Sequence, residues 1–563
     1  MLDLFLWLDG SATRYWTVAW ISFGLWFLGS VCPHDATHRW RRWNPPVVHA
    51  GLTLLMLLAF RWPGLGRNSQ LDNPDESQLL AGALTVAHYG QYWGMVDCAT
   101  AGPMDVLPLL LPKLVDLPVD YTTGRCVGLL LLWGATVFAW LAVRQVAGDQ
   151  PGRLLLMPMA CCLGFSHSPD FVQYSTEQAP IFYSALAIWL AIGAFSTAPL
   201  GRVRLALAGG VLALLPFAKL QAIPFTVCVG FCALVGILRR DGSPLRARLA
   251  AVGWLIGGGV LALGLMAVSV VRGAGLAEFY QSFWQSNLNY AQTRAYPWRE
   301  FGSRLGALSH LVSGFDFYLV PALALVALGV AAWRGLSPAA RQPALFGACL
   351  FLTGFVVVVA PGREFQHYLQ FLILPTALFI GLLYGGLIAG AGRAWVRHSW
   401  LAIVLLAGVV PQVYYRTHDG NPYQGYLRDA REQAVGAVAR HILRFVRPGD
   451  TMTVWAWMPT FHVQTQLPQG TRDAHAERQM SPNPLQSYFR HRYFTELETN
   501  RPAIFVDATG EENFGYHNRE ADGHERIPWL AEFVRHNYVL SADLETSRIY
   551  VRQDRWLALQ PHP

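Results

Sequence analysis

Long apolar segments alternate along this chain with short clusters of arginine. The segments lie between about Tyr15 and Val413, and most are long enough to cross the hydrocarbon core of a bilayer. The composition agrees, because 53% of the 563 residues are hydrophobic and only 14% are charged, which is too apolar for a soluble protein of this length. The pattern predicts a mainly α-helical, polytopic integral membrane protein.

The arginine clusters predict the orientation of the chain. Every second loop between apolar segments is basic, as expected for loops that stay in the cytoplasm. The net charge of +7 is therefore distributed over many loops and does not form one basic face, so nucleic acid is not expected as a partner. The basic residues that define these loops are His38, Arg39, Arg41, Arg42, Arg144, Arg153, Arg202, Arg204, Arg239, Arg240, Arg246, Arg248, Arg334, Arg341, Arg393 and Arg397.

Counting the apolar segments gives about twelve transmembrane helices within residues 1–415. The segments around Pro216 and Lys219 are short. The expected spans lie near residues 15–31, 46–62, 127–143, 154–165, 179–195, a short segment reaching 216, a segment ending at 238, 250–271, 318–333, 346–360, 371–387 and 400–413.

The composition changes to that of a soluble domain after Tyr415. Short apolar runs at 451–457, 503–507, 538–540 and 547–552 favour strands, and helical periodicity appears at 426–445 and 527–535. Residues 416–563 are therefore expected to form a small α/β domain. Because an even number of spans precedes it and the first basic loop follows one span, this domain should lie outside the cytoplasm. We expect a multi-pass protein of a bacterial inner membrane with this domain in the periplasm.

The outer loop 63–123 carries an acidic pair, Asp75 and Glu76, soon after the second span. Apolar residues recur at helical spacing from Leu79 to Ala87, which predicts a helix lying on the membrane surface, and a second short helix is expected at about 106–114. Polar residues next to a span are costly unless they face water or a substrate. The alternative for the pair is a solvated helix start, with Asp75 as the N-cap and both acids on the helix dipole.

Other polar residues are expected on the same outer face, close to the ends of spans. An acid that deprotonates an acceptor, together with cations that hold a phosphate leaving group, is what glycosyl transfer from a lipid-phosphate sugar requires. The residues that could share one outward-facing cavity are Asp72, Asp75, Glu76, Asp97, Asp105, Asp170, Glu177, Lys219, Arg294, Arg363, Glu364, His367 and Tyr368.

The sequence resembles the GT-C membrane glycosyltransferases, in particular the branch that contains protein O-mannosyltransferases and bacterial aminoarabinose transferases. Two departures stand out: one span precedes the usual first one, and the Lys-Pro-Pro familiar after the acidic pair is replaced by residues 101–105. The resemblance rests on Asn73-Pro74-Asp75-Glu76, Gly102-Pro103 with Pro108, Tyr174-Ser175-Thr176-Glu177, Phe217-Ala218-Lys219-Leu220-Gln221, the run from Arg363 through His367 to Tyr368, and Val454-Trp455-Ala456-Trp457-Met458-Pro459.

The resemblance implies a GT-C fold and an enzyme that moves a sugar from a polyprenyl-phosphate or diphosphate donor to a glycan, lipid or protein acceptor. It implies Asp75 as the catalytic base, with Glu76 beside it. The residues it implies for donor or substrate binding are Lys219, Arg363, His367, Tyr368, Glu177 and Asp105. No cofactor is assigned, although a divalent cation could bind among Asp72, Asp75, Glu76 and Glu177.

Each of these residues has a simpler explanation. Lys219 could extend its charge to the membrane surface, and Arg363 and His367 could anchor a loop at the lipid headgroups. Glu177 could cap the helix that begins near Pro180. The aromatic residues between 279 and 298 could line a polyprenyl or sugar site, but an interfacial aromatic belt is the more common role.

Two other functions fit about twelve spans with buried charge. A secondary transporter would bind near the bilayer midplane and usually has repeated halves, whereas the polar residues of this chain lie at one face and its halves do not match. A non-catalytic protein of cell-envelope assembly would use the outer domain to bind a partner and would not require Asp75.

Overall fold

The computed structural model describes residues 11–32, 43–71, 74–195, 201–240, 242–292, 338–363, 365–390, 394–418, 435–544 and 547–558, and short pieces between 300 and 336. The chain divides into two compact units. We call residues 1–66, 128–266 and 291–427 the helical unit, and residues 67–127, 267–290 and 428–563 the mixed unit. The outer loop thus belongs to the same unit as the C-terminal residues. The boundary predicted from composition, 415/416, remains a prediction.

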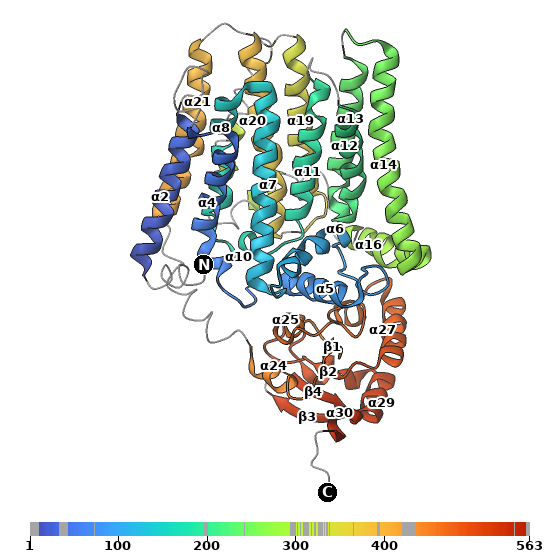
Figure 1. Ribbon diagram of the computed structural model, residues 1–563. Coiled ribbons are helices and arrows are strands. Elements are labelled where there is room, and N and C mark those ends of the chain that lie inside the picture. Colours follow the sequence, from blue (N-terminus) through green and yellow to red (C-terminus); the bar gives the residue numbers. More distant parts are fainter. Residues whose placement is uncertain are drawn as a thin grey trace. The chain divides into compact units, whose positions relative to one another are not determined.

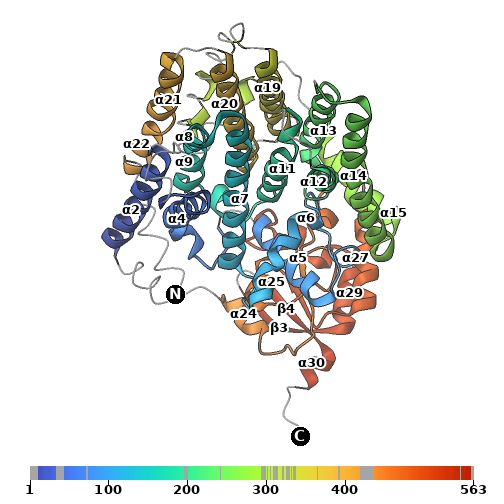
Figure 2. The same cartoon turned by 45° about the horizontal axis from the view of Figure 1, so that its top comes forward.

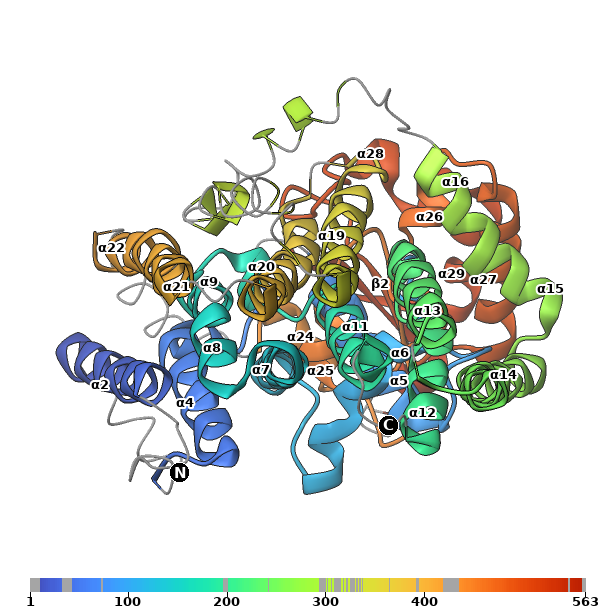
Figure 3. The same cartoon turned by 90° about the horizontal axis from the view of Figure 1, so that it is seen from above.

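The helical unit is a set of long helices whose axes run side by side (Figure 1). Residues 370–386 of helix α20 are all buried, and α20 lies among its neighbours when the helices are seen end-on, whereas α14 lies at the edge (Figure 3). The main helices are α2 (Ala12–Val31), α4 (Pro46–Leu65), α7 (Tyr121–Ala147), α8 (Asp149–Leu155), α9 (Met157–Phe165), α11 (Gln178–Ala191), α12 (Arg202–Leu214), α13 (Ile223–Leu238), α14 (Leu245–Gly273), α19 (Pro338–Val359), α20 (Gln370–Gly390), α21 (Ala394–Gly408) and α22 (Val410–His418).

Eight helices in the described part of the chain are long and apolar enough to cross a membrane, and the protein is a multi-pass membrane protein. They cover the expected spans near 46–62, 127–143, 179–195, 250–271, 346–360, 371–387 and 400–413, and the span ending at 238. Helix α2 forms where the first span was expected. The expected span at 154–165 is broken at Leu156 into α8 and α9, and Pro158 lies at the start of α9, a position that proline favours. Much of the expected span at 318–333 lies outside the described residues.

The C-terminal residues of the mixed unit form a four-stranded sheet in the order β1-β2-β4-β3. Strands β1 (Met452–Trp455) and β2 (Ile504–Asp507) are parallel, while β4 (Ser547–Arg552) pairs antiparallel with β2 and with β3 (Tyr538–Leu544). These strands confirm the small α/β region expected from the apolar runs, and Val454, Val506 and Ile549 align across the sheet.

Helices cover both faces of this sheet, because alternate residues of each strand point to opposite sides. Val454 and Val506 pack with α24 (Ala437–Ile442) and α25 (Thr460–Thr465). Trp455 and Phe505 pack with α27 (Gln486–Asn500) and α29 (Pro528–Asn537) on the other face. The two helix pairs are seen on either side of the strands in Figure 2.

The helix expected after the acidic pair is α5 (Asp75–Tyr89), and it ends at Gly90 in the left-handed conformation. All eleven residues from Glu76 to Val86 are buried, because α25, α6 (Pro103–Val106) and the 3₁₀ helix η1 (Leu107–Val115) pack around it. The helix is confirmed, but an amphipathic helix with one apolar face on the membrane is not what the structure contains. Its apolar residues are covered by protein.

Candidate functional site

Asp75 is the first residue of α5 and is half-buried. Pro74 occupies the N-cap position, so Asp75 itself is not the cap. It is an acid in the first turn, near the positive end of the helix dipole. The sequence thus places an acid where its backbone is fixed by a helix start.

The neighbouring carboxylate, Glu76, is fully buried and forms an ion pair with Arg125 of α7. Arg125 Nη2 lies 2.5 Å from Glu76 Oε2, and Arg125 Nε donates to Glu76 Oε1 at 2.9 Å. Arg125 also donates to the carbonyls of Arg67 and Ser69. The pair therefore fixes the residues that precede α5 to the start of α7.

The start of α5 is joined to α25 by a chain of hydroxyls. Ser77 Oγ donates to Gln70 Oε1 at 2.8 Å and lies 2.8 Å from the hydroxyl of Tyr121, which in turn lies 2.7 Å from Thr460 Oγ1. These contacts connect the helix that carries Asp75 to residues far along the chain. The position of Asp75 is thus set by several elements of the mixed unit.

Asp97 belongs to a buried network of charges in the mixed unit. Its Oδ2 lies 2.8 Å from Arg478 Nη2 and 2.9 Å from Arg492 Nη1, and both arginines also pair with Asp473. Burial raises the pKa of the Asp473 carboxyl, but Arg478 and Arg492 outweigh this and hold it well below its ordinary value. The network fixes the loop after α5 to the C-terminal residues. Asp105, a predicted site residue, is fully buried in α6.

Lys219 lies between two helices of the helical unit and forms a buried ion pair with Glu177. Its Nζ also donates to Thr176 Oγ1 at 2.6 Å and lies 4.7 Å from the ring centroid of Tyr368. Burial raises the pKa of the Glu177 carboxyl, but the charges of Lys219 and His367 bring it below its ordinary value. Glu177 is at the N-cap position of α11 without a capping hydrogen bond, so it pairs with Lys219 instead of capping that helix.

His367 adjoins this pair through the 3₁₀ helix η8 (Gln366–Leu369). Its Nδ1 lies 3.3 Å from Asp170 Oδ2, and Gln370 donates to the backbone carbonyl of Asp170 at 3.0 Å. Predicted residues Glu177, Lys219, His367 and Tyr368, together with Asp170, thus form one cluster, which we call the Lys219 cluster. Arg363 is half-buried in the turn after α19 and precedes η8, so it does not share a helical face with His367.

Several expected contributors lie outside the described residues, namely Asp72, Arg294, Tyr296, Trp298 and Glu364. Of the aromatic residues at 279–298, Phe279 and Phe283 pack against the indole of Trp93, with ring centroids 5.3 and 5.7 Å away. They belong to a packed aromatic group in the mixed unit.

Sequence reasoning missed Arg125 and Arg492, which hold the acidic loop in place. Arg125 had a detectable signal: it precedes a span on the expected outer side, where arginine is uncommon by the positive-inside rule. Arg492 had none, since its partner Asp97 is 395 residues away in the chain.

Two of the four carboxylates that the sequence offered to a divalent cation are paired with basic side chains. Arg125 binds Glu76, and Lys219 binds Glu177, so these two do not fit a metal ligand set. Within the described ranges, Asp507, His524 and Glu525 have ligand atoms within 4.8 Å of one another. Arg548 binds both Asp507 and Glu525, and a cation therefore already occupies that group.

No protein-family model matches the sequence, and no curated protein matches it significantly. The solved structures similar in fold include two of one protein. ArnT from Cupriavidus metallidurans in the apo state matches with a TM-score of 0.53, and the same protein bound to undecaprenyl phosphate with 0.52. Each is 14% identical to this chain, and each match covers 89% of this chain and 97% of the other.

The chain has the GT-C fold. The likeness to ArnT covers most of both proteins. This confirms the fold expected from the resemblance of motifs such as Asn73-Pro74-Asp75-Glu76.

Proposed function

We propose that this GT-C protein is a membrane glycosyltransferase that moves a sugar from a polyprenyl phosphate, or diphosphate, to an acceptor on the outer face of a bacterial inner membrane. The observation that carries the proposal is the fold match to ArnT, a structure of which contains undecaprenyl phosphate. The placement of Asp75 at a fixed helix start supports it.

Asp75 is the proposed base. A hydroxyl or amine of the acceptor attacks the anomeric carbon of the sugar, its proton passes to Asp75, and the bond from that carbon to the phosphate oxygen breaks. The phosphate leaves with the bonding electrons, so the charge to be stabilised develops on the donor phosphate. Glu76 is proposed to position this acid through Arg125.

The Lys219 cluster and Arg363 are the proposed contributors to the donor phosphate. Lys219 already shares its charge with Glu177, so its attraction for a phosphate is weaker than that of an isolated lysine. Arg363 can hold two phosphate oxygens at once. We therefore propose Arg363 as the main cation and Lys219, His367 and Tyr368 as neighbours that shape the site. Asp105 remains a proposed donor- or substrate-binding residue.

The proposal is tested by incubating the purified full-length protein with a panel of labelled sugars linked to polyprenyl phosphates and diphosphates. We expect one donor to be consumed and a glycosylated product to form in the presence of a cell-envelope extract. Donor-independent uptake of a solute into liposomes would support the transporter instead. A protein that transfers no sugar from any donor but binds an envelope protein would support an assembly role.

The donor residues are tested by binding of the consumed donor. We expect Arg363→Ala to weaken donor binding by roughly 1.5 to 3 kcal/mol, the range for a lost hydrogen bond to a charged group. Arg363→Lys should not restore it, because lysine lacks the planar pair of donors. Titration of the lipid-linked donor into each variant in detergent measures this. Unchanged affinity of both variants would place the phosphate elsewhere.

A further inference from the structure

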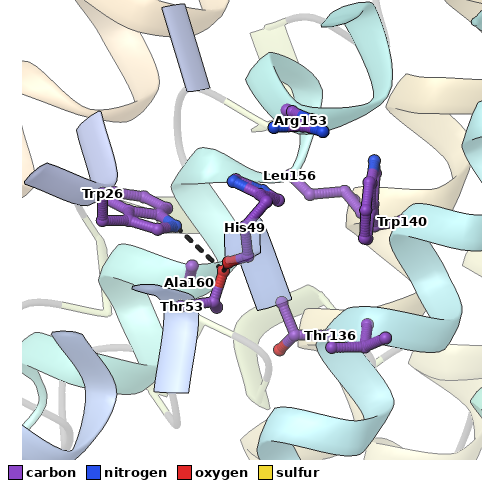
Figure 4. A pocket seen from close by; sticks show the side chains of 9 residues that line it. Trp26, His49, Thr53, Thr136, Trp140, Arg153, Leu156 and Ala160 are labelled. Carbon is purple, nitrogen blue, oxygen red and sulfur yellow. Dashed lines mark hydrogen bonds between the residues drawn. The ribbon is translucent and has the colours of Figure 1, made fainter. Parts of the chain in front are cut away.

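The cavity between α2, α4, α7, α8 and α9 of the helical unit is too small to bind a substrate (Figure 4). Its volume is about 20 Å³, which is room for about one water molecule. Two of the polar groups that line it, Trp26 Nε1 and Thr53 Oγ1, are hydrogen-bonded to each other at 3.1 Å. Buried donors beside a half-exposed aromatic ring occur instead in the mixed unit.

Three aromatic side chains of the mixed unit pack together where β1 ends. Ala456 directly follows β1 with a left-handed φ of 72°, which costs energy for a residue other than glycine. The next residue, Trp457, stacks on the imidazole of His475, with ring centroids 5.4 Å apart and 25° between the planes. Phe514 lies nearly perpendicular to the indole, with centroids 5.0 Å apart. We call Trp457, His475 and Phe514 the Trp457 stack.

The Trp457 stack lies at the carboxyl ends of two parallel strands. Trp457 comes just after β1, and Phe514 belongs to the loop that follows β2. Ligands of α/β sheets commonly bind in this place. Asn513 holds the loop, because its Oδ1 accepts from the N–H groups of Gly515 and Tyr516 at 3.0 and 2.9 Å. The ring of Phe514 is nevertheless 50% exposed, so an aromatic surface is offered to a ligand from an ordered loop.

Two buried nitrogens of this stack have no hydrogen-bond partner within the described ranges. They are Nε1 of Trp457 and Nε2 of His475, and His475 is only 7% exposed. His475 Nδ1 accepts from the N–H of Glu477 at 3.2 Å, so the neutral ring carries its proton on Nε2. Burial lowers the pKa of His475 to about 3, which keeps the ring neutral at physiological pH. Both nitrogens are therefore donors, and a buried donor without an acceptor is costly.

The partner that fits these donors has acceptor oxygens and an apolar face and carries no negative charge. Both donors are neutral, so neither attracts an anion strongly. Glu511 and Glu512 are exposed in the loop that carries Phe514, and their charges repel an anion. The hydroxyls of a sugar can accept from both N–H groups, while the C–H face of its ring packs on an aromatic side chain. Among glycan, lipid and protein acceptors, a neutral glycan therefore fits best.

Hydrogen bonds connect the Trp457 stack to the helix that carries Asp75. Thr460 begins α25 just after Trp457, and its hydroxyl lies 2.7 Å from that of Tyr121. The hydroxyl of Tyr121 in turn lies 2.8 Å from Ser77 Oγ, in the first turn of α5. A ligand of the stack is thus held by the elements that fix the start of α5.

We propose that Trp457, His475 and Phe514 form a binding site for a neutral saccharide of a glycan acceptor. Trp457 Nε1 and His475 Nε2 donate to hydroxyl oxygens, and the ring of Phe514 packs on the face of the sugar. Both nitrogens are covered in the structure, so binding includes a turn of the Phe514 ring away from the indole. The role of the site rests on the proposed function, whose acceptor class it names, but its affinity for saccharide is measurable without any donor.

The test is a titration of the full-length protein in detergent, without donor, with neutral oligosaccharides of glucose, mannose, galactose and N-acetylglucosamine. Galacturonic acid oligosaccharides of the same length and a neutral peptide are titrated in parallel. We expect one neutral oligosaccharide to bind about tenfold or more tightly than the anionic ones and the peptide. Binding of no neutral oligosaccharide, which would leave only ordered water at the two donors, would overturn the proposal, as would preference for the peptide or the anionic oligosaccharides.

The variants Trp457→Phe, His475→Asn and Phe514→Ala identify the contacts. Trp457→Phe keeps an aromatic ring and removes the N–H group, whereas His475→Asn keeps an acceptor for the N–H of Glu477 and removes the Nε2 donor. Each variant should weaken saccharide binding about fivefold or more, as expected for one lost hydrogen bond or stacked ring. Phe514 is exposed, so Phe514→Ala remains informative if a variant at a buried position does not fold.

The matched controls are Trp529→Phe and Phe533→Ala in the same unit. Their rings stack on each other along α29, with centroids 5.1 Å apart. Saccharide affinity should be unchanged in both controls. Unchanged affinity in Phe514→Ala, or a loss in the controls equal to that in the variants of the Trp457 stack, would overturn the proposal.

A transfer assay separates this inference from the proposed function. With a donor and a glycan acceptor, Trp457→Phe should raise the KM for the glycan about fivefold and lower kcat much less. Saccharide binding by a protein that transfers no sugar would refute the proposed function and leave the site in place. Transfer to a glycan with the same KM in Trp457→Phe and the parent would refute the site and leave the proposed function in place.

Discussion

Two adjacent carboxylates that look alike in the sequence have different environments in the structure. Asp75 and Glu76 are adjacent, yet Asp75 is half-buried in the first turn of α5 while Glu76 is fully buried against Arg125. Neighbouring side chains on a helix point in directions about 100° apart, which leaves the Asp75 carboxylate partly exposed and turns that of Glu76 toward Arg125.

Variants of the buried pair of Lys219 and Glu177 can separate the effect of Lys219 on stability from its effect on donor binding. We expect Lys219→Met to lower the free energy of unfolding by about 3 to 5 kcal/mol, because it leaves the Glu177 carboxylate buried without its counter-ion. The double variant Lys219→Met/Glu177→Gln should recover most of that stability but not the affinity for the donor. Thermal unfolding in detergent and donor titration measure the two effects. Full recovery of both would mean that Lys219 is only structural.

Two buried histidines predict acid sensitivity of the mixed unit. Burial lowers the pKa of His462 to about 4 and that of His475 to about 3. Both values lie below the ordinary value near 6.5, so the folded state disfavours the proton. Stability is then complete above pH 6.5 and declines as the pH falls toward these values. Because of each histidine, the free energy of unfolding should fall by about 2 kcal/mol when the pH is lowered from 7.5 to 5.0.

This pH effect is measured by unfolding the full-length protein at pH 7.5 and 5.0. His462→Gln should reduce the difference in the free energy of unfolding between pH 7.5 and 5.0. The control His517→Gln, at an exposed position, should leave that difference unchanged. An identical acid loss in His462→Gln and the parent would show that the buried imidazole is not responsible.

Among the contacts between helices, the ion pair of Glu76 and Arg125 joins the starts of α5 and α7. The sequence predicts both helices from their apolar residues, but it does not predict that Arg125 joins Glu76 across 49 positions. The spacing of apolar residues predicts which face of a helix is buried, but it does not predict which distant side chain contacts that face. The break at Leu156 was missed for a related reason, since a single apolar run can hold two short helices.

We expect Arg125→Met to destabilise the protein by about 3 to 5 kcal/mol, because Glu76 then remains charged and buried alone. The double variant Arg125→Met/Glu76→Met should regain stability, as apolar replacements of buried ion pairs often do. If the ion pair only stabilises the fold, sugar transfer should return together with stability. A folded but inactive double variant would instead support the proposed role of Glu76 and Arg125 in positioning Asp75.

At the scale of the whole molecule, the sequence predicted the mainly helical, multi-pass architecture and the GT-C fold, and both are confirmed. The multi-pass architecture could be predicted because a bilayer requires long apolar helices and places arginine preferentially on one side, and both patterns are local in the sequence. The GT-C fold was expected only from the resemblance of short motifs. The grouping of residues 67–127 with 428–563 was not predicted, because it depends on contacts such as Arg492 with Asp97 that no local pattern encodes.

The orientation of the chain is a prediction of the arginine pattern. A reporter active only in the periplasm, fused after Pro563, should be active, and a fluorescent reporter that matures only in the cytoplasm should be dark at the same position. The reverse result would place the C-terminal residues in the cytoplasm and remove the basis for an outward-facing site.

The most direct test of glycosyl transfer is the rate of product formation by Asp75→Asn. This change keeps the size of the side chain and removes the base, so transfer should fall by at least 100-fold, within the usual range for general base catalysis, while thermal unfolding stays the same. The control is Asp116→Asn, an exposed position in the same loop with a left-handed backbone that asparagine tolerates. Loss of transfer in Asp75→Asn alone is the result we predict, and near-normal transfer by folded Asp75→Asn would contradict the account.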